Sequence, residues 1–146
     1  MRAVVQRVKR ADVKVGDEVV GNIEGGFLIL LAIHRDDEEN MIMKLAEKVV
    51  KLRIFSDVNE KMNDSIKDIG GEILVISQFT LYGDTKDGNR PSFIESARPE
   101  KAESFYLIFI EELKKLGIKK VASGRFGAHM EVSLVNDGPT TIILDF

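Results

Sequence analysis

Two strongly apolar runs constrain the fold of this chain more than any other feature. Residues 27–33 read Phe-Leu-Ile-Leu-Leu-Ala-Ile, and residues 72–78 read Glu-Ile-Leu-Val-Ile-Ser-Gln. The first run is apolar on both faces, which is typical of a central strand covered on both sides. Each run follows a glycine pair, at Gly25 and Gly26 and at Gly70 and Gly71, where the chain can turn. The sequence therefore predicts a sheet with two buried central strands.

Further elements follow from local patterns. A helix is expected after the acidic run at 36–39, with Asp36 or Asp37 as its cap, because apolar residues recur there at helical spacing. A second helix is expected over residues 100–116, with Pro99 as its first residue and Gly117 just beyond its end. The core-facing stripe of this second helix is predicted to be Ala102, Phe105, Phe109, Leu113 and Leu116. Strands are predicted at 4–12 (continued by 13–15), 18–23, 53–55, 118–122, 130–135 and 140–146, a turn at 57–63, and loops at 83–91 and 123–129.

The order of these elements is βββ-α-ββ-α-βββ, which lacks the alternation of strand and helix found in doubly wound folds. We therefore expect an α+β fold. Its sheet should be strongly curved and largely antiparallel or mixed, forming a partial barrel flanked by two helices. No linker, repeat or low-complexity segment divides the chain, so residues 1–146 are expected to form a single domain.

Composition narrows the range of functions. The 24 acidic and 21 basic residues give a net charge of −3, which does not by itself suggest a nucleic-acid protein. The absence of cysteine excludes a thiol nucleophile, disulfides and cysteine-ligated metal. The most apolar run is too short to cross a bilayer, and the first residues do not resemble a signal peptide. We therefore expect a cytoplasmic protein without membrane association.

Residues 77–81, Ser-Gln-Phe-Thr-Leu, form the first candidate site because they place polar side chains at the end of a buried strand. If the strand continued, Ser77 and Phe79 would share one face, and Gln78 and Thr80 would share the other. The Gln78 amide could hold a polar substrate group, and backbone N–H groups at a frayed strand end could stabilise an oxyanion. Alternatively, these side chains only satisfy nearby backbone groups. Neither histidine, His34 nor His129, has metal-ligand spacing.

The segment Asn-Asp-Gly-Pro at 136–139 is the second candidate, because it separates two β-rich runs. Proline cannot sit within a central ladder, so an ordinary hairpin turn is one interpretation. A cis bond between Gly138 and Pro139 is the other. Rigid backbone there could accept hydrogen bonds from a protonated amine and exclude a side chain of one handedness.

Five stretches of the chain, in this order and spacing, resemble the D-aminoacyl-tRNA deacylase family, also called D-tyrosyl-tRNA deacylases. They are residues 1–8, 70–82, 90–93, 124–127 and 132–141. Thr140 departs from the pattern, since the family more often has valine there. The resemblance implies a metal-independent, cytoplasmic homodimer without a cofactor. It also implies hydrolysis of the ester between a D-amino acid and the 3′-terminal adenosine of tRNA, a step of translation quality control.

The resemblance also implies roles for individual residues. The catalytic pocket would be formed by Ser77, Gln78, Phe79 and Thr80. The Gly138–Pro139 bond would be cis, this pair would reach into the pocket of the opposite subunit, and Arg7 would hold it in place. Steric exclusion of L-amino acids would provide chiral proofreading. Glycine mischarged on tRNA-Ala would not be excluded and would also be hydrolysed. Contacts to tRNA are expected at Lys86, Arg90, Arg125 and residues 114–120.

Several alternatives remain open from the sequence. Either the Thr80 hydroxyl is the nucleophile, or backbone amides stabilise the oxyanion while the substrate 2′-hydroxyl helps to activate water; we favour the second because no base adjoins Thr80. A relative with relaxed chirality would clear L-alanyl-tRNA and would need a trans Gly-Pro bond. Two further hypotheses remain. The protein could be a non-catalytic dimeric module that binds nucleic acid or protein, or it could be a small-molecule esterase or amidase.

Overall fold

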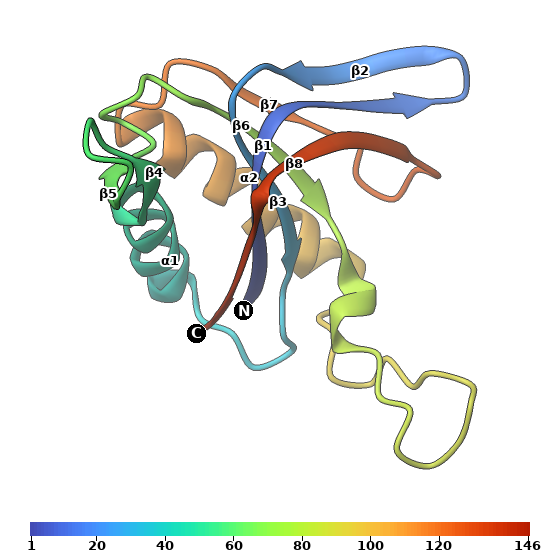
Figure 1. Ribbon diagram of the computed structural model, residues 1–146. Coiled ribbons are helices and arrows are strands. Elements are labelled where there is room, and N and C mark those ends of the chain that lie inside the picture. The colour runs from blue at the N-terminus through green and yellow to red at the C-terminus, as the bar shows by residue number, and fades with distance from the viewer.

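The computed structural model describes residues 1–146 and has a mixed sheet flanked by two helices (Figure 1). This architecture confirms the predicted α+β class and its partial barrel. The elements in chain order are β1 (Arg2–Val15), β2 (Glu18–Ile23), β3 (Gly26–Ala32), α1 (Glu39–Lys51), β4 (Arg53–Ser56), β5 (Met62–Ser65), β6 (Glu72–Ser77), the 3₁₀ helix η1 (Phe79–Tyr82), α2 (Pro99–Lys115), β7 (Val121–Ser123) and β8 (Glu131–Asp145).

The long strand β1 organises the main sheet, which has the order β2-β1-β3-β6-β7. Residues 2–8 of β1 pair with β3 and residues 11–15 pair with β2, while β8 pairs with β1 along most of its length. All three of these pairings are antiparallel, whereas β3–β6 and β6–β7 are parallel. The sheet curls until β2 approaches β7. A Cβ added to Gly21 would lie 2.7 Å from the carbonyl oxygen of Ser123, so only glycine allows this closure.

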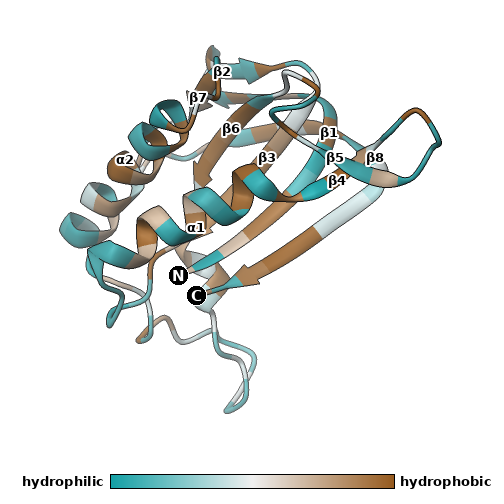
Figure 2. Ribbon diagram, turned by 90° about the vertical axis from the view of Figure 1, so that its left-hand side faces the viewer, coloured by the Kyte–Doolittle hydropathy of each residue, from teal (hydrophilic) through white to brown (hydrophobic).

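The central strands β3 and β6 are largely hydrophobic (Figure 2), and their residues are buried on both faces. Phe27, Ile29, Ile73 and Val75 belong to a 25-residue core that also contains the buried faces of both helices. The alternate residues Leu28, Leu74 and Ile76 belong to a second core of seven buried residues, most of them from β1 and β2. The prediction that 27–33 and 72–78 are buried strands is therefore confirmed, because each face meets a different core.

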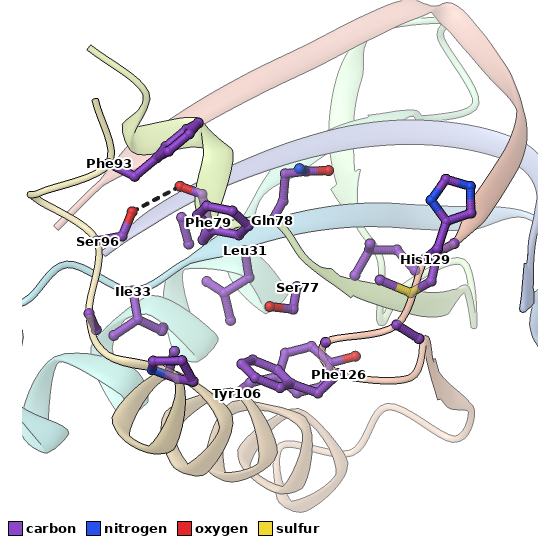
Figure 3. Close-up of a pocket in the computed structure, with 18 of the residues that line it drawn as sticks. Leu31, Ile33, Ser77, Gln78, Phe79, Phe93, Ser96, Tyr106, Phe126 and His129 are labelled. Carbon is purple, nitrogen blue, oxygen red and sulfur yellow. Dashed lines mark hydrogen bonds between the residues drawn. The ribbon is translucent and has the colours of Figure 1, made fainter. Parts of the chain in front are cut away.

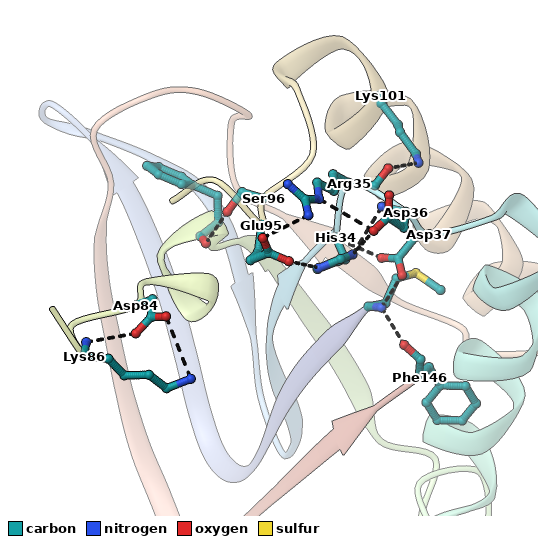
Figure 4. Close-up of polar contacts among 12 residues, drawn as sticks. His34, Arg35, Asp36, Asp37, Asp84, Lys86, Glu95, Ser96, Lys101 and Phe146 are labelled. Carbon is teal, nitrogen blue, oxygen red and sulfur yellow. Dashed lines mark hydrogen bonds and ion pairs between the residues drawn. The ribbon is translucent and has the colours of Figure 1, made fainter. Parts of the chain in front are cut away.

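The helices begin and end close to their expected positions. Pro99 is the first residue of α2, and Gly117 follows its last residues with a φ of +95°. The predicted cap of α1 is wrong, because Glu38 is the N-cap residue. Asp37 instead accepts hydrogen bonds from the Met1 ammonium group and from the His34 N–H, at 2.6 Å each (Figure 4). The buried stripe of α2 is confirmed at Ala102, Phe109 and Leu113, but Tyr106 and Ile110 are buried as well, whereas Phe105 and Leu116 are only partly covered.

Three other predictions are corrected by the structure. The turn at 57–63 is shorter and leads into a strand, β5, which pairs with β4. The strand expected at 118–122 is β7, at Val121–Ser123. Residues 130–135 and 140–146 do not form a hairpin, because both pair with β1 as parts of the single strand β8. No helix is long and apolar enough to span a bilayer.

Candidate active site

A pocket of about 550 Å³ opens at the carboxyl ends of β3 and β6 (Figure 3). Thirteen of its 19 lining residues are hydrophobic. The polar positions in its wall include Ser77, Gln78 and Ser96, and α2 and the loop that precedes β8 complete it. Its size and mostly apolar lining with a few convergent polar groups are typical of a small-molecule site. The pocket therefore contains three of the four predicted catalytic residues, namely Ser77, Gln78 and Phe79.

The chain changes direction directly after β6. The Gln78 N–H still donates to the Leu31 carbonyl oxygen at 2.8 Å, but residues 79–82 then form η1. The expected alternation of residues 77–80 between two faces is therefore wrong, since the strand ends at Ser77. The first hydrogen bond of η1 runs from the Leu81 N–H to the Gln78 carbonyl. The N–H groups of Phe79 and Thr80 precede this bonded turn, so neither has a partner within η1.

Thr80 lies at the edge of this site rather than in the pocket wall. Its side chain is exposed, and its hydroxyl oxygen accepts a hydrogen bond from the Gln78 side-chain amide. No histidine, carboxylate or lysine forms a hydrogen bond with that hydroxyl. The arrangement provides no general base to convert Thr80 into a nucleophile.

Two contacts fix the position of η1 against the loop that leads to α2. The ring of Phe79 meets the ring of Phe93 edge to face, with centroids 5.0 Å apart. The Ser96 hydroxyl donates to the Phe79 carbonyl oxygen at 3.1 Å (Figure 3). The Phe79 carbonyl shares a peptide plane with the Thr80 N–H, and the Gln78 carbonyl, which accepts from the Leu81 N–H, shares one with the Phe79 N–H. Because both carbonyls are held, the orientations of the two free N–H groups are held as well. A preformed set of donors of this kind suits a developing negative charge.

Tyr106, Phe126, His129 and Met130 also line the pocket, although none of them is among the predicted site residues. The Tyr106 hydroxyl donates to the Val75 carbonyl oxygen at 2.8 Å, and its ring lies 6.0 Å from that of Phe126. Burial raises the pKa of Tyr106 to about 12. The phenol is therefore neutral at pH 7 and ties α2 to β6. Tyr106 lies beside the predicted stripe of α2, and the spacing of apolar residues does not distinguish it from Phe105.

Gly138 and Pro139 lie in a wide bulge of β8, and their peptide bond is cis, as the resemblance implies. Thr141 pairs with Gln6 and Asn136 pairs with Val8, so four residues of β8 face the single residue Arg7. The register places this bulge level with the start of β3, whereas the pocket is at the end of β3. The offset is about 13 Å along the strands, and β8 is three strand positions from β6. Neither Gly138 nor Pro139 lines the pocket of its own chain.

Arg7 is buried against the bulge. Its Nε donates to the Asp137 carbonyl oxygen at 3.3 Å and lies equally far from the Asp137 carboxylate. Its Nη1 donates to the carbonyl oxygen of Ile54 on β4. A Cβ on Gly138, which has a φ of +115°, would lie 2.7 Å from the Arg7 guanidinium. The guanidinium therefore packs directly against the Gly138 backbone.

The predicted tRNA-contacting cations are distributed unevenly. Lys114, Lys115 and Lys120 pair with glutamates, and the first two lie at the end of α2. The pocket is at the start of α2, so Lys114 is about 18 Å beyond Ala102 along the helix. Arg125 pairs with Glu18, and Lys86 lies 3.9 Å from Asp84 (Figure 4). Arg90 belongs to the loop that joins η1 to α2 and forms no salt bridge.

The two histidines have different surroundings. His34 Nε2 lies 2.9 Å from the Glu95 carboxylate, and its Nδ1 accepts the Asp36 N–H at 3.2 Å (Figure 4). These contacts connect the end of β3 to the loop before α2, outside the pocket. His129 is exposed at the pocket rim without a hydrogen bond.

Comparison with solved structures defines the class of fold first. A structure described as a probable eukaryotic D-amino acid tRNA deacylase matches with a TM-score of 0.86 at 18% identity, over 99% of this chain and 98% of that chain. The match shows that the curled mixed sheet with two helices is a deacylase fold. A structure of the c-Myc DNA unwinding element binding protein matches with a TM-score of 0.94 at 41% identity, over 100% and 99% of the two chains.

The chain belongs to the D-Tyr-tRNA(Tyr) deacylase family, whose profile matches residues 4–145. A D-aminoacyl-tRNA deacylase from Thermosipho africanus (strain TCF52B) is 55% identical over 99% of this chain and 97% of the relative. One from Roseiflexus sp. (strain RS-1) is 58% identical over 99% and 93% of the two chains. Membership of the family, expected from the sequence, is therefore confirmed.

Proposed function

We propose that this protein hydrolyses the ester bond of D-aminoacyl-tRNA and releases the free D-amino acid and tRNA. The observation that carries the proposal is a pocket lined by Phe79 at the strand end, where the backbone N–H groups of Phe79 and of the neighbouring Thr80 are unpaired, in a chain of this family. The apolar lining suits an aminoacyl-adenosine end rather than a charged metabolite. The substrate class is the one named for its relatives.

The reaction needs little from side chains because an aminoacyl ester is already activated. Water adds to the ester carbonyl, the carbonyl oxygen becomes an oxyanion, and the bond to the ribose 3′-oxygen breaks as that oxygen takes up a proton. We assign the stabilisation of this oxyanion to the free N–H groups of residues 79 and 80, because such stabilisation is usually the largest single contribution in acyl transfer. The neighbouring 2′-hydroxyl of the substrate helps to activate water. Gln78 is assigned to orient the substrate by its amide.

Replacement of Thr80 by valine tests this mechanism, because it removes the hydroxyl and keeps the backbone N–H. Single-turnover hydrolysis of D-tyrosyl-tRNA should stay within about ten-fold of wild type, since one neutral hydrogen bond contributes about 1 kcal/mol. Loss of hydrolysis by more than a thousand-fold, with substrate binding intact, would instead assign the nucleophile to Thr80.

We further propose that the protein acts as a homodimer in which Gly138 and Pro139 of one subunit complete the pocket of the other. Support comes from their position, because both residues are exposed and lie outside the pocket of their own chain. In the dimer they would form a rigid wall that leaves no space for an L side chain. Exclusion by shape tolerates many D side chains, and glycine, which has no side chain, would also be hydrolysed, including glycine mischarged on tRNA-Ala.

The test is hydrolysis of D-tyrosyl-tRNA, L-tyrosyl-tRNA and glycyl-tRNA by the purified protein, with its mass measured by light scattering. We expect the protein to be a dimer and to hydrolyse D-tyrosyl-tRNA and glycyl-tRNA but not L-tyrosyl-tRNA. Equal hydrolysis of the D and L esters would keep the chemistry and remove the proofreading role, in favour of the relative that clears L-alanyl-tRNA. If the protein is a monomer and still has full chiral selectivity, the selectivity does not come from Gly138 and Pro139 of a partner subunit.

A second candidate function is a dimeric nucleic-acid-binding module. It is favoured by the 41% identity to a protein named for binding a DNA unwinding element. Hydrolysis of none of the three esters, together with DNA binding that weakens steeply with salt, would support this candidate. The cytoplasmic location expected from the sequence remains a prediction.

A further inference from the structure

We propose that Asn136 is a positioning residue that sets how far Gly138 and Pro139 project from the sheet. The selectivity part of this inference rests on the proposed function, whereas the structural part does not. Asn136 is the last residue of β8 to pair with β1 before the bulge, and pairing resumes at Thr141. In this proposal, the side chain of Asn136 closes the bulge formed by residues 137–140.

The bulge disrupts the hydrogen bonds of an ordinary antiparallel ladder. Four residues of β8 stand opposite Arg7 alone, and one of them, Pro139, has no N–H to donate. The Arg7 carbonyl oxygen therefore lacks the donor that a regular strand would present to it. Such a group needs another partner when it is partly buried.

The side-chain amide of Asn136 supplies this partner. Its Nδ2 donates to the Arg7 carbonyl oxygen at 2.9 Å and to the Thr140 carbonyl oxygen at 3.1 Å. The first bond crosses to β1, and the second spans the bulge from its first flanking residue to its last member. The Thr141 hydroxyl, 3.5 Å from Asn136 Oδ1, lies on the acceptor side of the same amide. One amide group thus fixes the width of the base of the bulge.

This contact is distinct from that of Arg7. The Arg7 guanidinium holds the bulge from its inner side through Asp137, and it connects the bulge to β4. Asn136 instead ties the two ends of the bulge to each other and to the β1 backbone. If only Arg7 acted, the bulge could still widen at Thr140 while Asp137 stayed in place. The two residues therefore restrict different motions.

Substitution of Asn136 by aspartate keeps the shape and turns both donors into acceptors that face carbonyl oxygens. Two neutral hydrogen bonds correspond to about thirty-fold in an opening equilibrium. Hydrogen exchange of the amides of Thr140 and Thr141 should therefore accelerate by about thirty-fold or more. Asn59→Asp is the matched control, because Asn59 is exposed in the turn between β4 and β5 and its side chain forms no hydrogen bond. If Asn136→Asp does not fold, Asn136→Ser removes the same donors without adding charge.

The functional readout is the ratio of D-tyrosyl-tRNA to L-tyrosyl-tRNA hydrolysis. We expect the Asn136 variant to lose at least ten-fold in this ratio while its D-ester rate stays within a few-fold of wild type, since the pocket residues are unchanged. Exchange and selectivity equal to those of the control would overturn the inference. If the wild type hydrolyses neither ester, the proposed function fails, and hydrogen exchange alone decides whether Asn136 closes the bulge.

Discussion

Removing the guanidinium of Arg7 should weaken both the fold and the placement of the bulge. Arg7→Met keeps an unbranched apolar stem of similar volume, so most of its packing remains. The variant removes the donor to the Ile54 carbonyl oxygen and both contacts to Asp137. The Arg7 side chain is only 10% exposed, so water cannot readily replace these bonds.

The expected magnitude follows from the three contacts. A hydrogen bond from a charged donor to a buried carbonyl contributes about 1.5–3 kcal/mol, and this value applies to Ile54. The contacts to Asp137 are long, and its carboxylate is 38% exposed, so they add at most about 1 kcal/mol. The free energy of unfolding should therefore fall by about 1.5–4 kcal/mol. Since the bulge also loses its inner support, chiral selectivity should fall as well.

The assay is urea unfolding followed by far-UV circular dichroism, with hydrolysis of D- and L-tyrosyl-tRNA measured on the same preparation. Arg53→Met is the control, because Arg53 is exposed and its contacts to Asn63 are open to water; its loss should not exceed about 1 kcal/mol. A change below about 0.5 kcal/mol in Arg7→Met, with selectivity unchanged, would refute the view that this guanidinium holds the bulge.

Three further predictions concern the rest of the fold. Burial raises the pKa of Tyr82 and Tyr106, the only tyrosines, to about 12 each, so absorbance at 295 nm should show no phenolate below about pH 11. Unfolded tyrosines titrate near pH 10, so stability should be lost as the pH rises between about 10 and 12; a folded-state titration near 10 would contradict this. Gly21→Ala places a Cβ against a carbonyl of β7 and should lower the free energy of unfolding in urea by about 1–3 kcal/mol. In the control Gly25→Ala the added Cβ meets nothing within 4 Å, so this free energy should change by less than about 0.5 kcal/mol. Asp37→Asn leaves the buried N-terminal ammonium group without its carboxylate partner at 2.6 Å, so the free energy of unfolding in urea should fall by about 3–5 kcal/mol. An unchanged midpoint of urea unfolding would refute this prediction.

The fold was predictable where one physical signal dominated. The apolar runs of β3 and β6 required cover on both faces, and Pro99 and Gly117 marked the ends of α2. The errors came where tertiary contacts override local patterns. Asp37 satisfies the cap preference of α1 equally well, but the nearby ammonium group takes its carboxylate. The predicted stripe of α2 includes Ala102, Phe109 and Leu113 correctly, but it contains Phe105 in place of Tyr106 because both residues are aromatic.

The site was predictable only in part for the same reason. Residues 77–80 were recognised as a strand end, but their sequence does not say that the strand stops at Ser77 and turns into η1. In the sequence, the bulge at Gly138 cannot be distinguished from a hairpin turn because both flanking runs are β-rich. Only the register shows that both runs pair with β1. The pocket residues contributed by α2 and by the loop before β8 come from segments distant in sequence, and no local pattern marks them.

The burial of β6 on both faces limits how this site could be redesigned. Ile73 and Val75 contact one core, Leu74 and Ile76 contact the other, and the strand carries Ser77 and Gln78 directly to the pocket. A change of volume in β6 would thus disturb two cores and shift the reacting groups together. The part of the pocket wall around Phe126 and Met130 is only partly buried. A library aimed at new side-chain specificity should therefore vary that wall and leave the strand intact.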